Sequence, residues 1–383
     1  MHRQALPRCG CLCLRKHEEA HMTVLVGILF GGYLLYLLWE KRANDRALKS
    51  FQHIIHVNGI RGKTSVCRMI DAHLRGAGYR VFTKTTGSTP CYIDVSGQEH
   101  LIRRRGPAHI GEQLAMIRKA AGQHAEILIL ECMAVQPELQ RVAQERIVQG
   151  DLNVITNVRY DHIFEMGESL EEIAGSLSGT IPQNGILFTA DETFFPYFQA
   201  VCQDKESEAV LCRPSREAPG ENEAIACTVG AYLGIPSEKF PRHMAAYQED
   251  FGGQKLYWKE GTVFLNLFSA NDPQSTRMLL ERHFPDSGGV TLLYNNRTDR
   301  PDRLLLFIRR FFHEVPYSRL LIMGESRSLA LRTLRRSDIA AEGVSSWREA
   351  VAKAGHAPLV GIGNIKGQAY EMIQYFEEGG EHE

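Results

Sequence analysis

The clearest chemical signal in the sequence is a short glycine-rich segment that ends in a lysine and two hydroxyl side chains. It follows an apolar run and consists of Asn58, Gly59, Ile60, Arg61, Gly62, Lys63, Thr64 and Ser65. Glycines allow backbone N–H groups to close around phosphate oxygens, and the dipole of a following helix favours negative charge there. We expect Lys63 to reach the β- and γ-phosphates of ATP and Thr64 to offer its hydroxyl to Mg²⁺.

The segment departs from the common phosphate-loop pattern at one position. That pattern is GxxxxGK[ST], and its first glycine would fall at position 57, which is Val. The plain alternative is a glycine-rich turn that exposes a lysine. Because a strand-like run precedes the segment and a helix-like run follows it, the sequence favours the nucleotide-binding interpretation.

Two later apolar runs end in side chains that bind hard metal ions. One ends in Glu131, and the next leads to Asp161 and His162. Ligands of open α/β sheets gather at the carboxyl ends of the strands, and Mg²⁺ prefers carboxylate, hydroxyl and phosphate oxygens. We therefore expect Thr64 and Glu131 to hold one Mg²⁺ ion, and Glu131 with His162 to hold a second. The alternatives are a solvated loop glutamate and a capped turn.

The elements that position these groups alternate between short apolar runs and helical stretches. Up to about residue 255 this order predicts a parallel sheet covered by helices on both faces. A second alternation starts near Val263 and predicts a smaller, Rossmann-like α/β unit. The boundary falls between Tyr247 and Gly261, and we divide the chain into an ATP-binding unit at 40–255 and a second unit at 256–383.

A membrane-like segment precedes both units. Residues 23–39 carry no charge over 17 residues, which at about 1.5 Å per residue suffices for a single span. The alternative is a buried core helix. Met22 immediately precedes the run, and we interpret residues 1–22 as a leader, of which translation from Met22 would leave out residues 1–21. Positive charges follow the run at Lys41, Arg42, Arg46 and Lys49. Arg3, Arg8, Arg15 and Lys16 on the other side oppose this asymmetry in the full sequence. With translation from Met22, all the positive charge near the span follows it, which predicts a cell-membrane protein with its main domain on the cytoplasmic side.

Composition limits the remaining classes. The chain has 383 residues, of which 44% are hydrophobic and 23% charged, so two globular cores are feasible. A formal net charge of −1 gives no sign of a nucleic-acid binder. Nine cysteines without a framework spacing predict reduced thiols. The cluster Cys9, Cys11 and Cys13 is interpreted as part of the leader rather than as a metal site.

Together, these residues resemble the Mur ligase superfamily, which includes the folylpolyglutamate synthases. The matching positions are Gly59 to Ser65, Glu131 and the pair Asp161-His162. The segment ANDPQS (residues 270–275) resembles a degenerate form of the family's AHNPxS segment. The segment NRTDR (residues 296–300) resembles the family's arginine segment. The resemblance implies a Mur-type central domain followed by a Rossmann-like domain. It also implies that Lys63, Glu131 and His162 are catalytic.

A closer resemblance is to the ligase subunit of poly-γ-glutamate synthase. It covers nearly the whole chain through NGIRGKTS, KTTGS, GPAHIGEQ, ECMAVQPE, TIPQNG, ANDPQST, NNRTDRPDR, MGES and GIGNIKG. It implies ATP-dependent polymerisation of glutamate through an acyl phosphate, with ATP and Mg²⁺ required. The implied partners are glutamate, the growing poly-γ-glutamate chain and small membrane subunits of a synthase complex. A homo-oligomer is compatible with it, and nucleic acid is not expected.

Further site residues follow from the resemblance. Beyond the phosphate loop, ATP contacts are expected from Asn271, Asp272, Asn295, Arg297, Asp299 and Arg300. Carboxylate substrates are expected near Lys84, Thr85, Thr86, Arg103, Arg104 and Arg105. One departure is informative: many Mur ligases use a carbamylated lysine downstream of the Asp-His pair, and no lysine lies between Lys119 and Lys205. A second metal would therefore be held differently.

Two other functions share parts of this pattern. A Mur- or folate-type ligase that extends a small acceptor has the same chemistry without needing an anchor. A phosphate-loop kinase would bind ATP but would form no amide bond. An acyl phosphate, which hydroxylamine converts to a hydroxamate, distinguishes the ligases from the kinase.

Overall fold

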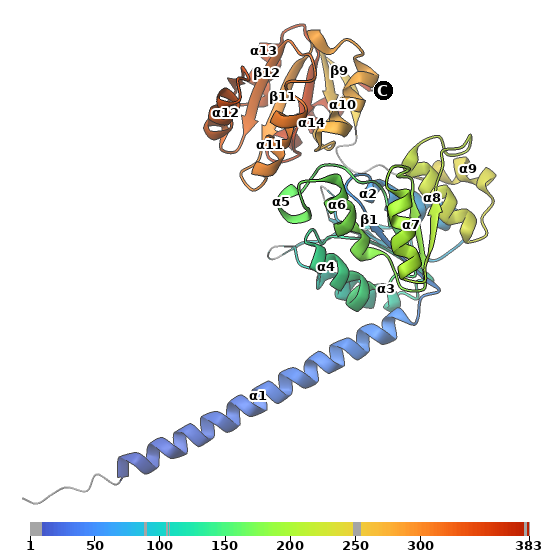
Figure 1. Ribbon diagram of the computed structural model, residues 1–383, viewed down its shortest axis with the longest axis vertical. Coiled ribbons are helices and arrows are strands. Elements are labelled where there is room, and N and C mark those ends of the chain that lie inside the picture. Colours follow the sequence, from blue (N-terminus) through green and yellow to red (C-terminus); the bar gives the residue numbers. More distant parts are fainter. Residues whose placement is uncertain are drawn as a thin grey trace, which may run out of the picture.

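The computed structural model describes residues 10–87, 90–104, 106, 108–247, 254–378 and 381–382, and side chains from Met22 to Glu378 within these ranges. Within them the chain forms one long N-terminal helix and two α/β units, each built on its own sheet (Figure 1). The predicted fold class is confirmed: both sheets are mainly parallel and carry helices on both faces.

The first sheet has the strand order β4-β3-β2-β5-β1-β6-β7-β8. Strands β2, β5, β1, β6, β7 and β8 are parallel, whereas β3 and β4 add an antiparallel edge. Their bounds are β1 His53–Asn58, β2 Val81–Thr85, β3 Cys91–Ile93, β4 Glu99–Leu101, β5 Ile127–Glu131, β6 Leu152–Ile155, β7 Ile186–Thr189 and β8 Glu208–Leu211.

Helices cover both faces of this sheet because successive strand residues point to opposite sides. In β5, Ile127 and Ile129 pack towards α2 and α8, while Leu128 and Leu130 pack towards α3 and the end of α1. The helices of this unit are α2 Lys63–Gly76, α3 Glu112–Gly122, α4 Pro137–Val142, η1 Ala143–Val148, α5 Ile163–Met166, α6 Leu170–Leu177, η2 Ser178–Thr180, α7 Phe195–Asp204, α8 Glu221–Tyr232, η3 Ser237–Lys239 and α9 Phe240–Met244.

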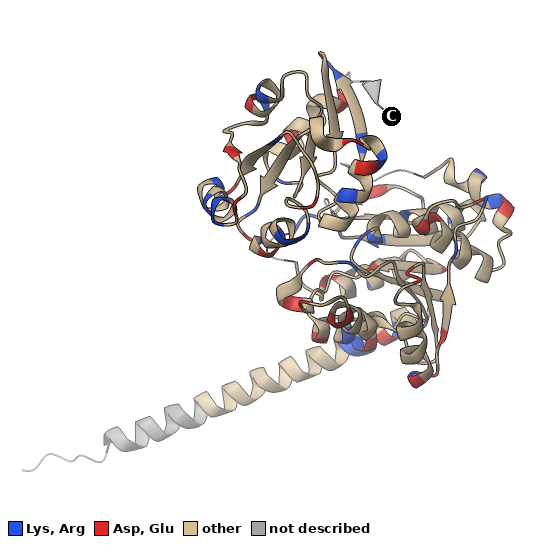
Figure 2. Cartoon of the chain, turned by 45° about the horizontal axis from the view of Figure 1, so that its top comes forward, with Lys and Arg blue, Asp and Glu red and all other residues tan. Residues whose placement is uncertain are grey.

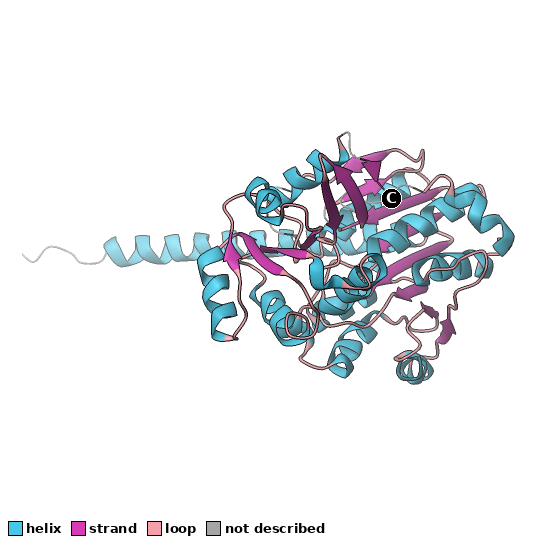
Figure 3. Cartoon of the chain, turned by 90° about the horizontal axis from the view of Figure 1, so that it is seen from above, coloured by secondary structure: helices cyan, strands magenta, loops and turns pink. Residues whose placement is uncertain are grey.

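The second sheet has the order β13-β12-β11-β14-β10-β9-β15, in which β9 pairs antiparallel with both β10 and β15 and all other neighbours are parallel. Its strands are β9 Lys255–Lys259, β10 Thr262–Asn266, β11 Thr291–Asn296, β12 Arg319–Gly324, β13 Glu342–Gly343, β14 Leu359–Ile362 and β15 Glu381–His382. Its helices are α10 Pro273–His283, η4 Ser287–Gly289, α11 Pro301–Arg310, α12 Arg327–Arg336, α13 Trp347–Ala354 and α14 Gln368–Glu377. One core lies under α10, α11 and α12, and another lies under α13 and α14. Seen from above, the sheet strands lie between layers of helices (Figure 3).

The long helix α1, Gly10–Leu48, projects away from the first unit (Figure 1). Its part from Met22 to Leu48 is, in the described chain, the one helix long and apolar enough to cross a membrane, and its most apolar window of 18 residues has a mean hydropathy of 1.9. None of that apolar window is buried against protein, unlike the core helix considered as an alternative. Length and composition are therefore compatible with the predicted anchor.

The last turns of α1 are docked onto the first unit. Ala47 and Leu48 are buried beside α3 and η1, and Asn44 Nδ2 donates to the Ile147 carbonyl at 3.0 Å. Basic residues gather on α1 where it meets this unit (Figure 2). The helix thus has two parts: an apolar part without protein contacts and a docked, basic end.

This division predicts different outcomes for two truncations. A chain that begins at Lys41 keeps the docked turn and loses only the Glu40–Arg118 ion pair, so we expect its unfolding free energy to lie within about 1 kcal/mol of that of the full chain. A chain that begins at Ser50 loses the buried Leu48 side chain and the Asn44 hydrogen bond, which together contribute about 2–4 kcal/mol. Urea unfolding measures both values, and equal stability of the two truncated chains would contradict the docking.

Candidate active site

The phosphate loop connects β1 to α2 and requires glycine at two positions. Gly59 has φ of 123° and Gly62 has φ of 80°, both in the region that other residues rarely adopt. A Cβ on Gly59 would lie 2.1 Å from Thr156 Oγ1, and one on Gly62 would lie 2.6 Å from Asn222 Oδ1. The loop backbone therefore packs directly against Thr156 after β6 and Asn222 in α8, and neither glycine position has room for a Cβ.

Residues after β6 hold the loop in this conformation. The Arg61 carbonyl accepts from Thr156 Oγ1 at 2.6 Å and from Asn157 Nδ2 at 3.1 Å, and Asn157 Oδ1 accepts from the Arg61 amide at 3.0 Å. Because β1 and β6 are parallel neighbours, their carboxyl ends meet at one edge of the sheet. The Thr-Asn pair thus positions the loop.

Lys63, the first residue of α2, folds back over the loop. Its ammonium donates to the Gly59 carbonyl at 2.7 Å and to the Ile60 carbonyl at 3.3 Å. Burial lowers the pKa of this ammonium, and the nearby Glu131 carboxylate partly offsets that effect. The lysine therefore lies within the loop, where it can exchange these carbonyls for phosphate oxygens.

Thr64 and Glu131 lie together, as expected for a Mg²⁺ site. Glu131 ends β5, is buried, and accepts from Thr64 Oγ1 at 3.0 Å and from the Thr86 amide at 2.7 Å. Gln113 donates to its main-chain carbonyl at 3.0 Å. A hydroxyl and a carboxylate beside a phosphate loop are the oxygen ligands that Mg²⁺ prefers, so these residues fit the ion.

A buried lysine lies beside this pair. Lys84, in β2, is fully buried, and its ammonium is 3.0 Å from Glu112 Oε1. Glu112 also accepts two hydrogen bonds from Arg104, at 2.7 and 3.0 Å. Burial alone would raise the pKa of the Glu112 carboxyl, but Arg104 and Lys84 outweigh it and bring this pKa down to about 2. Two cations of the predicted substrate region thus share one internal carboxylate.

Asp161 joins the two units. Its buried carboxylate pairs with Arg61 of the phosphate loop at 2.6 Å, with Arg303 of α11 at 3.2 Å, and with Arg300. Burial alone would raise the pKa of the Asp161 carboxyl, but the charges of Arg303 and Arg61 hold it well below its usual range. Burial lowers the pKa of the Arg303 guanidinium to about 10, which leaves it charged at neutral pH.

The second unit adds further polar groups to this junction. Asp272 caps α10 by accepting from the Ser275 amide at 2.8 Å, and its other oxygen accepts from Arg61 Nε at 2.9 Å. Asn271, in a left-handed backbone conformation, accepts from Arg303 at 3.1 Å. Asn295 donates to the carbonyls of Asn364 and Lys366 at 2.8 and 2.9 Å. Arg61 therefore binds both Asp161 and Asp272 and links the loop to the second unit.

His162 lies at the junction and has neighbours from both units. Arg300 Nη1 is 3.3 Å from His162 Nε2, and Glu165 is 3.9 Å from its other nitrogen. Burial lowers the pKa of His162 to about 4, so at neutral pH its Nε2 can accept from arginine. Among the described residues, no group of three or more His, Cys, Asp or Glu side chains forms a metal cluster. A second metal held by Glu131 and His162 stays a prediction.

The other predicted residues are distributed less tightly. Asn58 is buried, and its side chain donates to Gln140 Oε1 of α4 at 2.7 Å. Arg297 and Asp299 pair with each other at 2.6 Å in a more exposed turn. Thr85 Oγ1 contacts Cys91 Sγ at 3.1 Å inside the sheet, and Arg103 is exposed. Arg105 lies outside the described residues.

Several residues of the site were not predicted. Glu112 and Gln113 start α3, and Arg303 lies one helical turn after Arg300. The three-residue spacing of Arg300 and Arg303 could have predicted that Arg303 faces the same site as Arg300, because residues three apart share a helix face. Asp161 is predicted only as part of the Asp-His pair and not as a site residue of its own, although it makes the ion pairs with the three arginines.

Similar proteins are found along the whole chain. Residues 57–223 match the family described as "Mur ligase middle domain", and residues 255–379 match the "Poly-gamma-glutamate synthase CapB C-terminal domain". The capsule biosynthesis protein CapB of Bacillus anthracis is 30% identical over 387 residues, covering 93% of this chain and 83% of that protein. The PGA synthase CapB of Bacillus subtilis (strain 168) is 28% identical over 369 residues, covering 88% and 94%.

Solved structures support the fold. The bifunctional folylpolyglutamate synthase/dihydrofolate synthase from Yersinia pestis CO92 has a TM-score of 0.62 at 17% identity, covering 88% of this chain and 93% of its own. A structure of such an enzyme with Mn, AMPPNP and L-glutamate bound has a TM-score of 0.62 as well. These likenesses confirm the arrangement of two α/β units predicted from the motifs.

The junction at Asp161 yields a stability prediction. Asp161→Asn removes the one charge that three buried or half-buried guanidinium groups share, and we expect a loss of about 3–5 kcal/mol in unfolding free energy. Asp299→Asn is the matched control, since its ion pair with Arg297 is more exposed and should contribute at most about 1 kcal/mol. Urea unfolding compares the two variants. Equal losses would show that the buried carboxylate has no special role.

Proposed function

The chain belongs to the family of the CapB poly-γ-glutamate synthases, as its motifs predicted, and from this premise we propose that it joins glutamate residues by ATP-dependent amide ligation through an acyl phosphate. The observation that carries the proposal is the meeting of Lys63, Thr64 and Glu131 at one sheet edge. Arginines of the second unit face this edge through Asp161.

The first step transfers the γ-phosphoryl group of ATP. A carboxylate oxygen at the end of the growing chain attacks the γ-phosphorus, the bond to the bridging oxygen breaks, and ADP leaves. Charge on the transferred group must be neutralised in this step. In the proposed mechanism Lys63 provides one cation, while Thr64 and Glu131 would hold Mg²⁺, which when bound neutralises phosphate charge.

The second step forms the amide. The amine of an incoming glutamate attacks the acyl carbon, the bond to the phosphate oxygen breaks, the nitrogen loses a proton, and inorganic phosphate leaves. Both reactants are anionic, so the site must hold them together against repulsion. Lys84 and Arg104 share the single internal carboxylate of Glu112, so this group keeps a net positive charge for a substrate carboxylate.

A cavity of about 460 Å³ next to these residues offers room for an acceptor. It is lined by the segment that follows Glu131, including Met133, together with Ala108, Ile110 and Glu165. Met133 Sδ lies 3.5 Å from the Lys84 ammonium, so the cavity borders the buried lysine. We assign the incoming or terminal glutamate to this side of the phosphate loop.

Membrane placement completes the proposal. The apolar part of α1 would act as a single-pass anchor, with the two α/β units on the cytoplasmic side, where ATP is available. A polyanionic product cannot cross lipid unaided, since a charge at the bilayer centre costs at least about 2.5–3.5 kcal/mol. One span provides no conduit, and we therefore extend the proposal to small membrane partners that supply it.

Hydroxylamine trapping tests the reaction class. With ATP, glutamate and hydroxylamine, the full-length chain should form a γ-hydroxamate, because hydroxylamine intercepts an acyl phosphate. Lys63→Ala should reduce hydroxamate formation by at least about 10²-fold, the usual effect of removing one preorganised electrostatic contact. Lys353→Ala, on α13 of the second unit, is the control. Phosphorylation without hydroxamate would identify a kinase and refute the ligase.

Magnesium titration tests the metal ligands separately. Glu131→Gln replaces the carboxylate by a neutral amide, which binds Mg²⁺ less well. The Mg²⁺ concentration for half-maximal activity should therefore rise by about tenfold. Glu171→Gln, an exposed position on α6, is the matched control. A Glu131→Gln enzyme with the wild-type Mg²⁺ dependence would exclude this carboxylate as a ligand.

A further inference from the structure

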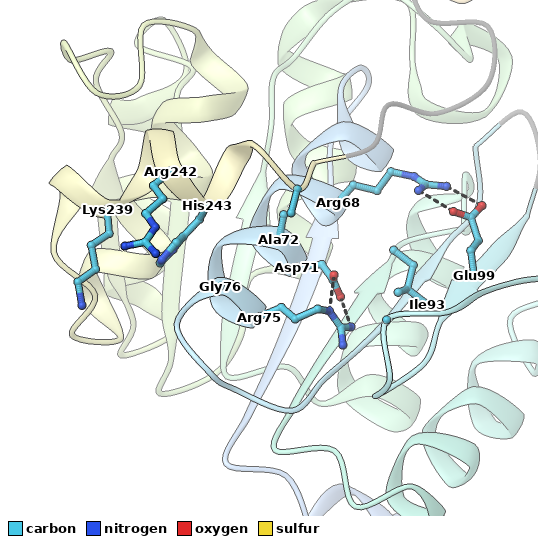
Figure 4. A pocket seen from close by; sticks show the side chains of 12 residues that line it. Arg68, Asp71, Ala72, Arg75, Gly76, Ile93, Glu99, Lys239, Arg242 and His243 are labelled. Atoms are coloured by element: carbon cyan, nitrogen blue, oxygen red, sulfur yellow. Dashed lines mark hydrogen bonds and ion pairs between the residues drawn. The ribbon is translucent and has the colours of Figure 1, made fainter.

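A cavity of about 810 Å³ lies beside α2, and none of its lining residues belongs to the phosphate loop (Figure 4). Its walls come from α2, from the β3–β4 hairpin, and from the segment formed by η3 and α9. The charged side chains that line it are Arg68, Asp71, Arg75, Glu99, Lys239 and Arg242. No step of the proposed reaction uses this cavity.

The lining carries more positive than negative charge. Both carboxylates are already paired: Glu99 binds Arg68 at 2.9 Å, and Asp71 binds Arg75 at 2.9 Å (Figure 4). Lys239 and Arg242 are exposed, and within the described chain neither side chain has a hydrogen bond or an ion pair. Two cations are therefore available to a ligand, and that ligand should be anionic.

The paired arginines make the wall rigid rather than binding the ligand. Arg75 also donates to the carbonyls of Val81, Asp94 and Val95, at 2.9, 3.1 and 2.8 Å. These bonds tie α2 to the strand and hairpin opposite. A wall held in this way loses little conformational entropy when a ligand binds.

The cavity lies on the same face of α2 as the proposed metal site. Thr64, Arg68 and Arg75 follow each other at intervals of four and seven residues, which places them on one side of the helix. At 1.5 Å per residue, Arg68 is about 6 Å and Arg75 about 17 Å from Thr64 along the helix axis. The cavity thus starts about one turn from the reacting end and leads away from it.

We propose that this cavity binds the part of the polymer that has already been made. The inference rests on the proposed function: an acceptor of γ-linked glutamates keeps one free α-carboxylate per residue and is a regular polyanion. Its reactive end would lie beside Thr64 and Glu131, while carboxylates further along pair with Lys239 and Arg242. A single glutamate is too short to reach from one group to the other.

Acceptor length is the variable that tests the site. We would compare the full-length chain with the Lys239→Glu/Arg242→Glu double variant, measuring KM and kcat for a γ-linked glutamate dimer and for a long γ-linked oligomer. The KM for the long oligomer should rise at least about tenfold in the variant, because like charges then face each other. The KM for the dimer and both kcat values should change by far smaller factors. Arg335→Glu, an exposed reversal on α12, is the control and should leave the KM ratio unchanged.

Binding without turnover provides the second readout. Fluorescence anisotropy of a labelled γ-linked oligomer should give an affinity that weakens with added salt and weakens at least about tenfold in the double variant. Lys239→Gln/Arg242→Gln should be intermediate, which separates lost charge from misfolding. Tighter binding of single-stranded DNA or anionic vesicles, abolished by the same variant, would overturn the assignment in favour of another polyanion.

The two proposals fail in different ways. A wild-type chain that forms no hydroxamate refutes the ligase, whatever the oligomer binds. A wild-type chain that forms hydroxamate, with the same oligomer affinity and the same KM ratio in the double variant, refutes only the polymer site.

Discussion

One buried carboxylate fixes the position of the second unit relative to the first. Asp161 ends the polar segment after β6, and its partners come from the phosphate loop and from the start of α11. A buried charge is tolerated only with good partners, so a small shift of either unit would leave Asp161 or an arginine without one. The loop geometry and the position of the second unit are therefore set together. A phosphate brought to the loop offers the same arginines another anion, which connects nucleotide binding to the contact between the units.

Glu131 plays a comparable part inside the first unit. It gathers donors from three places, the start of α2, the end of β2 and the side chain of Gln113 on α3. Parallel strands bring these segments to one edge, so residues far apart in the sequence converge without a dedicated loop. The lysine in β2 and the carboxylate in α3 extend this group towards the 460 Å³ cavity. The chemistry of the site follows largely from which strands are neighbours.

Much of this arrangement could be predicted because it depends on local patterns. The alternation of apolar runs and helical stretches predicts both sheets. The spacing of the glycines predicts the phosphate loop with Lys63 and Thr64. The end of an apolar run gave Glu131. Long-range pairing could not be predicted in this way. Nothing in the sequence near Asp161 indicates that Arg303, 142 positions later, is its partner. Likewise, the cavity beside α2 depends on α9 folding back against a helix about 170 residues earlier.

The continuity of α1 has a mechanical consequence. From Tyr33 to the turn buried against α3 and η1 the helix runs without a break and contains no proline, glycine or irregular turn. Kinks in helices arise at such features, and a helix without them behaves as a stiff rod. A tilt or an axial rotation of the apolar part is then transmitted to the first unit as a rigid-body movement. The tilt and axial rotation of α1 therefore set the direction in which the phosphate-loop edge of the first unit faces.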